Sequence, residues 1–161
     1  MEDEYSALMR QFGLFFRRAE RWHRSLHLHG GDRPLERAAY QVLNRIAGGG
    51  PSRLSALADD LCVDLSTISR QVAALQAAGL VGRMPDPRDG RASLIAATPA
   101  GQALFTHNRE KWTRSMRDLL ADWTPAERQE FVRLFTRLNE AIAAYADTAV
   151  HNTANGGQET R

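Results

Sequence analysis

The chain has 161 residues, of which 43% are hydrophobic and 25% charged, so it can bury a core and is not a disordered protein. Its net charge of +2 does not by itself indicate a nucleic-acid ligand, and its one cysteine, Cys62, excludes an internal disulfide and a cysteine-based zinc site. Its first residues lack the apolar stretch of a signal peptide, and no apolar run is long enough to span a membrane, so we expect a cytoplasmic protein.

Apolar and aromatic side chains recur at spacings of three and four along residues 4–28, which predicts an amphipathic helix. Pro34 is placed to begin a second helix, which we expect to end at Ala47. A break rich in glycine, residues 48–51, then separates this region from the next. The aromatic stripe of the first helix is wider than a single surface helix requires, which indicates a packing partner.

Two short helices come next, over residues 53–61 and from Asp64 onward. Ser52 is the expected cap of the first, and the carboxylate of Asp64 can accept a hydrogen bond from the amide of Thr67 at the start of the second. Gly79 stands where the end of a helix favours a left-handed residue. The apolar faces of the two helices are Leu54, Leu57, Ala58 and Leu61, and then Leu65, Ile68, Val72 and Leu75.

Two strands and two long helices complete the chain. Residues 80–84 and 93–97 are predicted strands, joined by a polar loop that contains two prolines. Thr98 followed by Pro99 is a typical start of a helix. Residues 124–127 form a capping box in front of the last helix.

This order of elements predicts a mainly α fold with a small β-hairpin wing, a winged helix-turn-helix with six helices. We divide the chain into an N-terminal dimerisation helix (1–31), a DNA-binding domain (32–98), C-terminal dimerisation helices (99–147) and a disordered tail (148–161). The middle part can close its own core. The flanking helices would leave apolar stripes in water, and a symmetric homodimer built from both chain ends would cover them.

The second short helix has a polar face at its start, formed by Ser66, Thr67, Ser69, Arg70 and Gln71. In a helix-turn-helix, these positions meet base edges in the major groove. Arginine can chelate guanine and glutamine can chelate adenine, and each such pair discriminates by roughly 1–3 kcal/mol. An ordinary solvated helix face is the alternative, but the segment that follows favours DNA.

The loop between the strands, PDPRDGRA, carries three candidate DNA-binding residues: Arg88, Asp89 and Arg91. Its prolines stiffen it, and Gly90 permits a tight tip. We expect Asp89 to hold the guanidinium of Arg91 extended toward a minor groove or a phosphate. Ser52 and Arg53 are further candidates for phosphate binding, through backbone amides and the guanidinium.

Residues 35–105 resemble the winged helix-turn-helix of the MarR family of bacterial transcription regulators. The resemblance is carried by the stretches LSALADDL, DLSTISRQVAALQAAGLVGR, PDPRDGRA and ATPAG. It implies a homodimer that binds a pseudo-palindromic operator in double-stranded DNA, usually as a repressor that a small ligand releases. Two positions depart from the family pattern. Cys62 replaces a glycine that is frequent in the turn, which predicts a turn that is strained or differently shaped, and Gly90 replaces a second wing arginine.

Some residues allow more than one interpretation. The side chains that could line a pocket for a small aromatic or phenolic effector are Phe12, Phe16, Trp22, His107 and Trp112, although we favour a dimer core for the aromatic ones. His23 and His27 share a helix face and, with His29, could hold a metal, but we favour a solvated helix end. Two carboxylates near Cys62 disfavour its thiolate, so we expect a buried or inert thiol rather than a redox sensor.

The chain contains no GxSxG, P-loop, GxGxxG or HExxH motif, so we expect a DNA-binding regulator that is not an enzyme and has no cofactor or metal. A winged-helix protein–protein interaction module and a metal or redox sensor are the alternatives. An interaction module would present apolar anchors where this chain has a polar helix face and wing arginines, and this difference favours DNA.

Overall fold

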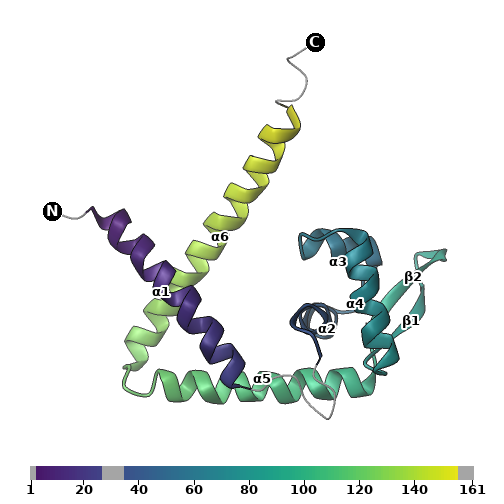
Figure 1. The fold of residues 1–161 in the computed structure, drawn as a ribbon, viewed down its shortest axis with the longest axis horizontal. Helices are drawn as coiled ribbons and strands as arrows, with labels where there is room; N and C mark the ends of the chain where they lie inside the picture. Colours follow the sequence, from purple (N-terminus) through teal and green to yellow (C-terminus); the bar gives the residue numbers. More distant parts are fainter. Residues whose placement is uncertain (1–2, 27–34, 156–161) are drawn as a thin grey trace. The chain divides into compact units, whose positions relative to one another are not determined.

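The computed structural model describes residues 3–26 and 35–155, which form six helices and one antiparallel pair of strands (Figure 1). In chain order they are α1 (Glu4–Ser25), α2 (Arg37–Gly49), α3 (Leu54–Asp60), α4 (Leu65–Ala77), β1 (Val81–Asp86), β2 (Asp89–Ala97), α5 (Pro99–Leu119) and α6 (Pro125–Asn155). The predicted mainly α fold with a β-hairpin is confirmed. The chain divides into two compact units, Met1–Ser115 and Met116–Arg161, which we describe separately.

The core of the first unit lies where α2, α3, α4 and the hairpin meet. Helices α2 and α4 contribute residues three or four apart, because these lie on one helix face, and α3 contributes two adjacent residues. Burying them removes most of the apolar surface of this region from water, which is the main stabilising contribution. The buried apolar residues are Ala39, Val42, Leu43 and Ile46 from α2, Leu57 and Ala58 from α3, Ile68, Val72 and Leu75 from α4, and Val81 and Ile95 from the strands.

The hairpin is longer than the sequence predicts. β1 and β2 continue to a pair between Asp86 and Asp89, and a two-residue turn of Pro87 and Arg88 joins them. The tip therefore does not lie at Gly90, which is a residue of β2 without a positive φ. The side chain of Asp86 accepts a hydrogen bond from the amide of Arg88 (2.9 Å), which closes the turn within two residues.

Helices α5 and α6 begin as predicted. The amide of Gly101 donates to the hydroxyl of Thr98 (3.1 Å), which caps α5. At the start of α6, the carboxylate of Glu127 accepts from the amide of Thr124 (2.7 Å), and the amide of Glu127 donates to the hydroxyl of Thr124 (3.3 Å). This reciprocal pair is the predicted capping box.

Helix α6 continues to Asn155, whereas we predicted an irregular tail from residue 148. Residues 148–155 are polar but contain neither glycine nor proline, so nothing in them stops a helix before Gly156. The predicted start of the second helix at Pro34 lies outside the described residues. None of the helices that the structure describes is long and apolar enough to cross a membrane.

Aromatic packing joins α1 to α5. The rings of Trp22 and Trp112 meet edge to face with their centroids 4.4 Å apart, and the indole N–H of Trp22 donates to the hydroxyl of Ser115 (2.7 Å). An ion pair between Arg37 and Glu20 (2.7 Å) joins α2 to α1. Helix α1 is thus attached to α2, which contributes to the small core, and to α5.

The turn between α3 and α4 contains the one described non-glycine residue with a positive φ, Cys62, at +52°. The amide of Cys62 donates to the carbonyl of Asp59 (3.1 Å), and the amide of Val63 donates to the carbonyl of Ala58 (3.0 Å). These two bonds form the helix end that normally carries glycine. Helix α4 ends with the same pair of bonds around Gly79, whose φ is +71°. The left-handed conformation of Gly79 is confirmed, and Cys62 adopts the same conformation, which is less favourable for a residue with a Cβ atom.

We expect Cys62→Gly to stabilise the protein by about 0.5–1 kcal/mol. Glycine relieves a left-handed conformation that destabilises other residues, and the greater freedom of the unfolded chain offsets part of this gain. Urea denaturation followed by circular dichroism measures the change. Gly79→Ala in the matching turn is the control and should destabilise the protein. A midpoint for Cys62→Gly at or below that of the wild type would contradict the strain.

Candidate nucleic-acid interface

Three of the five residues predicted to read bases lie on one exposed face of α4. Ser66, Ser69 and Arg70 are exposed. They share a face because Ser69 and Arg70 follow Ser66 by three and four residues. Thr67 and Gln71 are half-buried and flank this face. Helix α4 therefore presents hydroxyl and guanidinium groups over its first two turns, and its opposite side enters the core.

The capping carboxylate of Asp64 organises the start of this face. It accepts hydrogen bonds from the amide of Thr67 (2.8 Å), the hydroxyl of Thr67 (2.7 Å) and the hydroxyl of Ser66 (2.5 Å). The two hydroxyls, followed by the amide, hold the pKa of Asp64 well below its usual range. The guanidinium of Arg70 in turn donates to the hydroxyl oxygen of Thr67 (3.2 Å). The predicted N-cap is confirmed, and it also orients the neighbouring side chains.

Leu65 does not belong to the apolar face of α4, although its spacing predicts that it does. Its side chain is exposed, and so is that of Val63 in the preceding turn, whereas Ile68 is buried. The first turn of α4 projects beyond the part of the helix that the core covers. Periodicity alone cannot detect where this cover ends, so it missed Leu65, whose apolar side chain suits the methyl group of thymine.

The hairpin projects beyond α4 and forms the wing (Figure 1). Arg88 and Arg91 are exposed on it, and neither guanidinium has a hydrogen bond or an ion pair within the described part of the chain. Asp89 accepts from the amide of Arg91 (3.1 Å), so our prediction that it holds the guanidinium of Arg91 is wrong. It shapes the backbone of the wing instead.

Arg53 and Ser52 are bound to the wing. Two N–H groups of Arg53 reach one oxygen of Asp86, from Nε (2.8 Å) and Nη2 (2.6 Å), and Nη2 lies 3.4 Å from Asp89. The backbone of Ser52 pairs with Ile95 through both its amide (3.1 Å) and its carbonyl (2.9 Å). Ser52 therefore does not cap α3, whose N-cap residue is Arg53, and its amide is not available to a phosphate.

Asp86 is the residue of this region that sequence reasoning missed. Only 7% of its surface is exposed, although it stands in a polar stretch. The amide of Arg88 and the guanidinium of Arg53 hold the pKa of Asp86 below its usual value. No local pattern could predict this burial, because Arg53 is 33 residues away in the chain.

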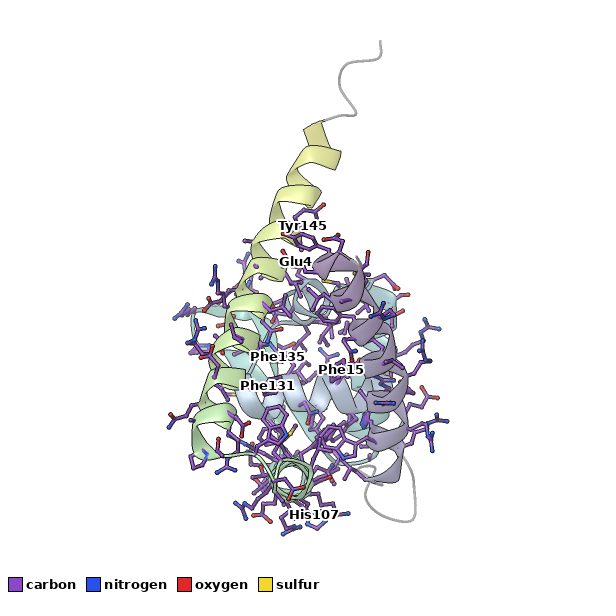
Figure 2. All side chains as sticks on the ribbon, turned by 90° about the vertical axis from the view of Figure 1, so that its left-hand side faces the viewer. Glu4, Phe15, His107, Phe131, Phe135 and Tyr145 are labelled. Atoms are coloured by element: carbon purple, nitrogen blue, oxygen red, sulfur yellow. The ribbon has the colours of Figure 1, made fainter. Side chains whose placement is uncertain are left out.

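The five residues considered for an effector pocket do not form one group. Phe12 and Phe16 stack on α1 with their ring centroids 6.2 Å apart, and Trp22 packs on Trp112. His107 is exposed and points away from α1 (Figure 2). It precedes Trp112 by five residues, which places it on another side of α5.

The candidate metal and redox residues are placed as follows. His23 is half-buried, with its ring 5.6 Å from that of Trp112, so the prediction of a solvated helix end is wrong for it. His27 and His29 lie outside the described residues. No group of three potential metal ligands occurs among the residues that the structure describes. The thiol of Cys62 is free and exposed, not buried.

A two-helix motif with an exposed polar second helix, followed by a hairpin with exposed arginines, defines a winged helix-turn-helix. Comparison with known proteins agrees. Residues 35–93 match the model of the MarR family. The chain is 38% identical over 108 residues to the HTH-type transcriptional regulator YxaD of Bacillus subtilis, a match that covers 67% of this chain and 76% of YxaD.

Two solved structures extend this similarity. A MarR family protein from Bacillus stearothermophilus has the same fold, with a TM-score of 0.73 at 18% identity, over 89% of this chain and 99% of that protein. BpsR from Bordetella bronchiseptica, whose DNA binding is regulated by 6-hydroxynicotinic acid, is 26% identical, with a TM-score of 0.58 over 80% of this chain and 98% of BpsR. This chain belongs to the MarR family of transcriptional regulators.

Proposed function

We propose that the protein is a homodimeric repressor that binds a pseudo-palindromic site in double-stranded DNA and is released by a small aromatic molecule. The start of α4 enters the major groove, and the wing lies against the neighbouring minor groove and backbone. Two-fold symmetry then spaces the two half-sites by about one helical turn of DNA, ~34–36 Å.

The observation that carries this proposal is the joint exposure of two sets of groups. Ser66, Ser69 and Arg70 form one polar face of α4, and the wing beside it carries Arg88 and Arg91 with guanidinium groups that no described residue binds. Groups of these kinds bind base edges and phosphates. A surface built to bind protein would have apolar anchors at its centre, whereas the exposed Val63 and Leu65 lie at one end of this face.

Each residue predicted on α4 and on the wing has a role in this proposal. Arg70 chelates guanine, Gln71 flanks the reading face and contacts adenine, and the hydroxyls of Ser66, Thr67 and Ser69 contact base edges. Arg91 enters the minor groove, Arg88 binds the backbone, and Asp89 shapes the wing between them. Ser52 offers only its hydroxyl, which lies 3.4 Å from the carbonyl of Gly50.

Uncovered apolar side chains support the homodimer. The described part of α1 exposes Tyr5, Leu8, Met9, Phe15 and Phe16, and α6 exposes Phe131, Leu134, Phe135, Ile142 and Tyr145. Figure 2 shows the labelled aromatic residues on both helices. Two helices with such faces leave more apolar surface in water than a monomer normally tolerates, and a two-fold interface would bury it.

The proposed effector rests on similarity and on aromatic residues. The DNA binding of BpsR is regulated by 6-hydroxynicotinic acid, a small aromatic molecule. In this chain, Trp22 and Trp112 pack where α1 meets α5, and Phe12 and Phe16 lie further along α1. A ligand that separates these rings would alter how α1 and α5 are attached to the DNA-binding core. Because His107 points away from α1, we place it last among the candidates.

Arg70→Ala should relax the preference for one or two base pairs in each half-site, by roughly tenfold per position, because a bidentate contact to guanine is lost. The measurement starts with selection of bound fragments from a random duplex pool. Titration of the selected duplex and its single-base variants then gives the preference at each position.

The matched control is Arg109→Ala, which removes the same charge from an exposed position on α5, outside α4 and the wing. It should keep the wild-type preference. Unchanged preference in Arg70→Ala would reject the reading role of this arginine. A wild-type protein that enriches no sequence from the pool would reject sequence-specific DNA binding as a whole.

A further inference from the structure

The tip of the wing is attached to the helices at one point. β1 pairs only with β2, and a two-stranded hairpin is marginally stable by itself. Its base is fixed by the backbone pairing of Ser52 with Ile95. Asp89 precedes Ile95 by six residues in β2 and lies toward the tip, roughly 20 Å away at the rise of a strand. Among the described residues, Arg53 is the one helix-end residue whose hydrogen bonds or ion pairs reach residues 86–91.

The geometry at this point orients the backbone of the wing arginines. One oxygen of the buried Asp86 accepts from Arg53, and the other accepts from the amide of Arg88. The two carboxylate oxygens of Asp89 are used in the same way: one accepts from Arg53 (3.4 Å), and the other accepts from the amide of Arg91 (3.1 Å). Each carboxylate thus connects the guanidinium of Arg53 to the backbone of one wing arginine.

The charges at this point argue against a direct contact of Arg53 with DNA. One guanidinium faces two carboxylates, so the positive charge of Arg53 is already compensated and attracts a phosphate only weakly. The N–H groups of Arg53 that reach Asp86 would have to leave a nearly buried carboxylate in order to bind a phosphate. Both considerations disagree with the phosphate-binding role that the sequence suggests for Arg53.

We propose that Arg53 is a positioning residue, which holds the wing through Asp86 and Asp89 so that Arg88 and Arg91 meet the DNA. This role rests on the proposed function, because its consequence is DNA affinity. Its mechanical part, the attachment of the wing tip, is a property of the protein alone.

The mechanical part is tested without DNA. In Arg53→Gln, the heteronuclear NOE of the amides of residues 88–91 should fall, since the tip has lost its attachment, while the amides of α4 keep their values. Arg53→Lys retains the charge but not the pair of N–H groups that reach Asp86. Its NOE values should lie between those of Arg53→Gln and the wild type. Equal NOE values in Arg53→Gln and the wild type would overturn the attachment, whether or not the protein binds DNA.

The functional part is tested by two comparisons on the selected duplex. Asp86→Asn should weaken binding, roughly tenfold, because the wing is released. If Arg53 bound phosphate directly, Asp86→Asn would strengthen binding, since it frees the guanidinium and removes a negative charge. The second comparison is a cycle with Arg91→Ala, which itself should weaken binding to most sequences and lower the salt slope by about 1.

If Arg53 acts through the wing, Arg53→Gln weakens binding strongly in the wild type and little in Arg91→Ala. Additive losses in this cycle, or tighter binding by Asp86→Asn, would overturn the proposal. Circular dichroism of each variant verifies that the helical core, to which Arg53 and Asp86 do not belong, is intact. Failure of the wild type to bind any duplex would reject the proposed function, and the NOE comparison would still decide the attachment.

Discussion

Gly101→Ala should destabilise the protein by about 3 kcal/mol and lower its melting temperature by roughly 10 °C. A Cβ atom at Gly101 would lie 2.0 Å from the carbonyl oxygen of Leu80 and 3.3 Å from a methyl group of Leu43. The carbonyl belongs to the backbone and accepts a hydrogen bond from the amide of Thr98 (3.0 Å), so it cannot move without disturbing the start of α5. Differential scanning calorimetry measures the effect.

Gly82→Ala is the matched control for this substitution. Gly82 lies in β1, its φ is not positive, and a Cβ atom there meets nothing within 4 Å. Its melting temperature should stay within about 2 °C of the wild type. If Gly101→Ala had the same melting temperature as the control, the close approach of α5 to Leu80 would be refuted.

Phe135→Asp should convert the proposed dimer to a monomer and abolish tight binding to the proposed operator, because each half-site is then bound by one chain alone. Phe135 is 41% exposed and stacks on Phe131 with ring centroids 5.6 Å apart (Figure 2). At the centre of an apolar interface, a carboxylate would be buried without a partner. Light scattering should give twice the 18.0 kDa of one chain for the wild type and a single chain for the variant.

Thr136→Asp places the same charge on the next residue of α6, about 100° away around the helix. It should remain a dimer and bind DNA as the wild type does. A dimeric Phe135→Asp would reject this face of α6 as the interface. A wild-type mass of one chain would reject the homodimer itself. Circular dichroism distinguishes loss of the dimer from loss of α6.

Local patterns in the sequence predicted most of the fold. The apolar spacing of α2 and α4 reflects burial of one helix face, and residues such as Leu43 and Leu75 are fully buried as expected. The caps at Asp64 and Thr98 were also predictable, because a cap involves only residues two or three apart. Leu65 was not, because its exposure depends on where the neighbouring helices end.

In the candidate interface, too, the features that depend on local sequence were predictable and those that depend on tertiary contacts were not. The polar face of α4 and the exposure of Arg88 and Arg91 follow from spacing and from the turn residues. The contact of Arg53 with Asp86 does not, because the local sequence around an arginine at the start of a helix is the same whether its side chain faces solvent or a carboxylate. Only tertiary structure brings Arg53 to Asp86.

The hydrogen bonds at the start of α4 restrict which bases can face it. An ionised carboxylate only accepts hydrogen bonds, so the hydroxyl hydrogens of Ser66 and Thr67 both point to Asp64. To a base in the groove, these two side chains can then offer only lone pairs, and the oxygen of Thr67 already accepts one hydrogen bond from Arg70. In the major groove, the amino groups of cytosine and adenine can donate to such oxygens, whereas the carbonyls of guanine and thymine would meet them lone pair to lone pair. In the proposed complex, the carboxylate of Asp64 would thereby affect which bases are bound, through the hydroxyl groups that it orients.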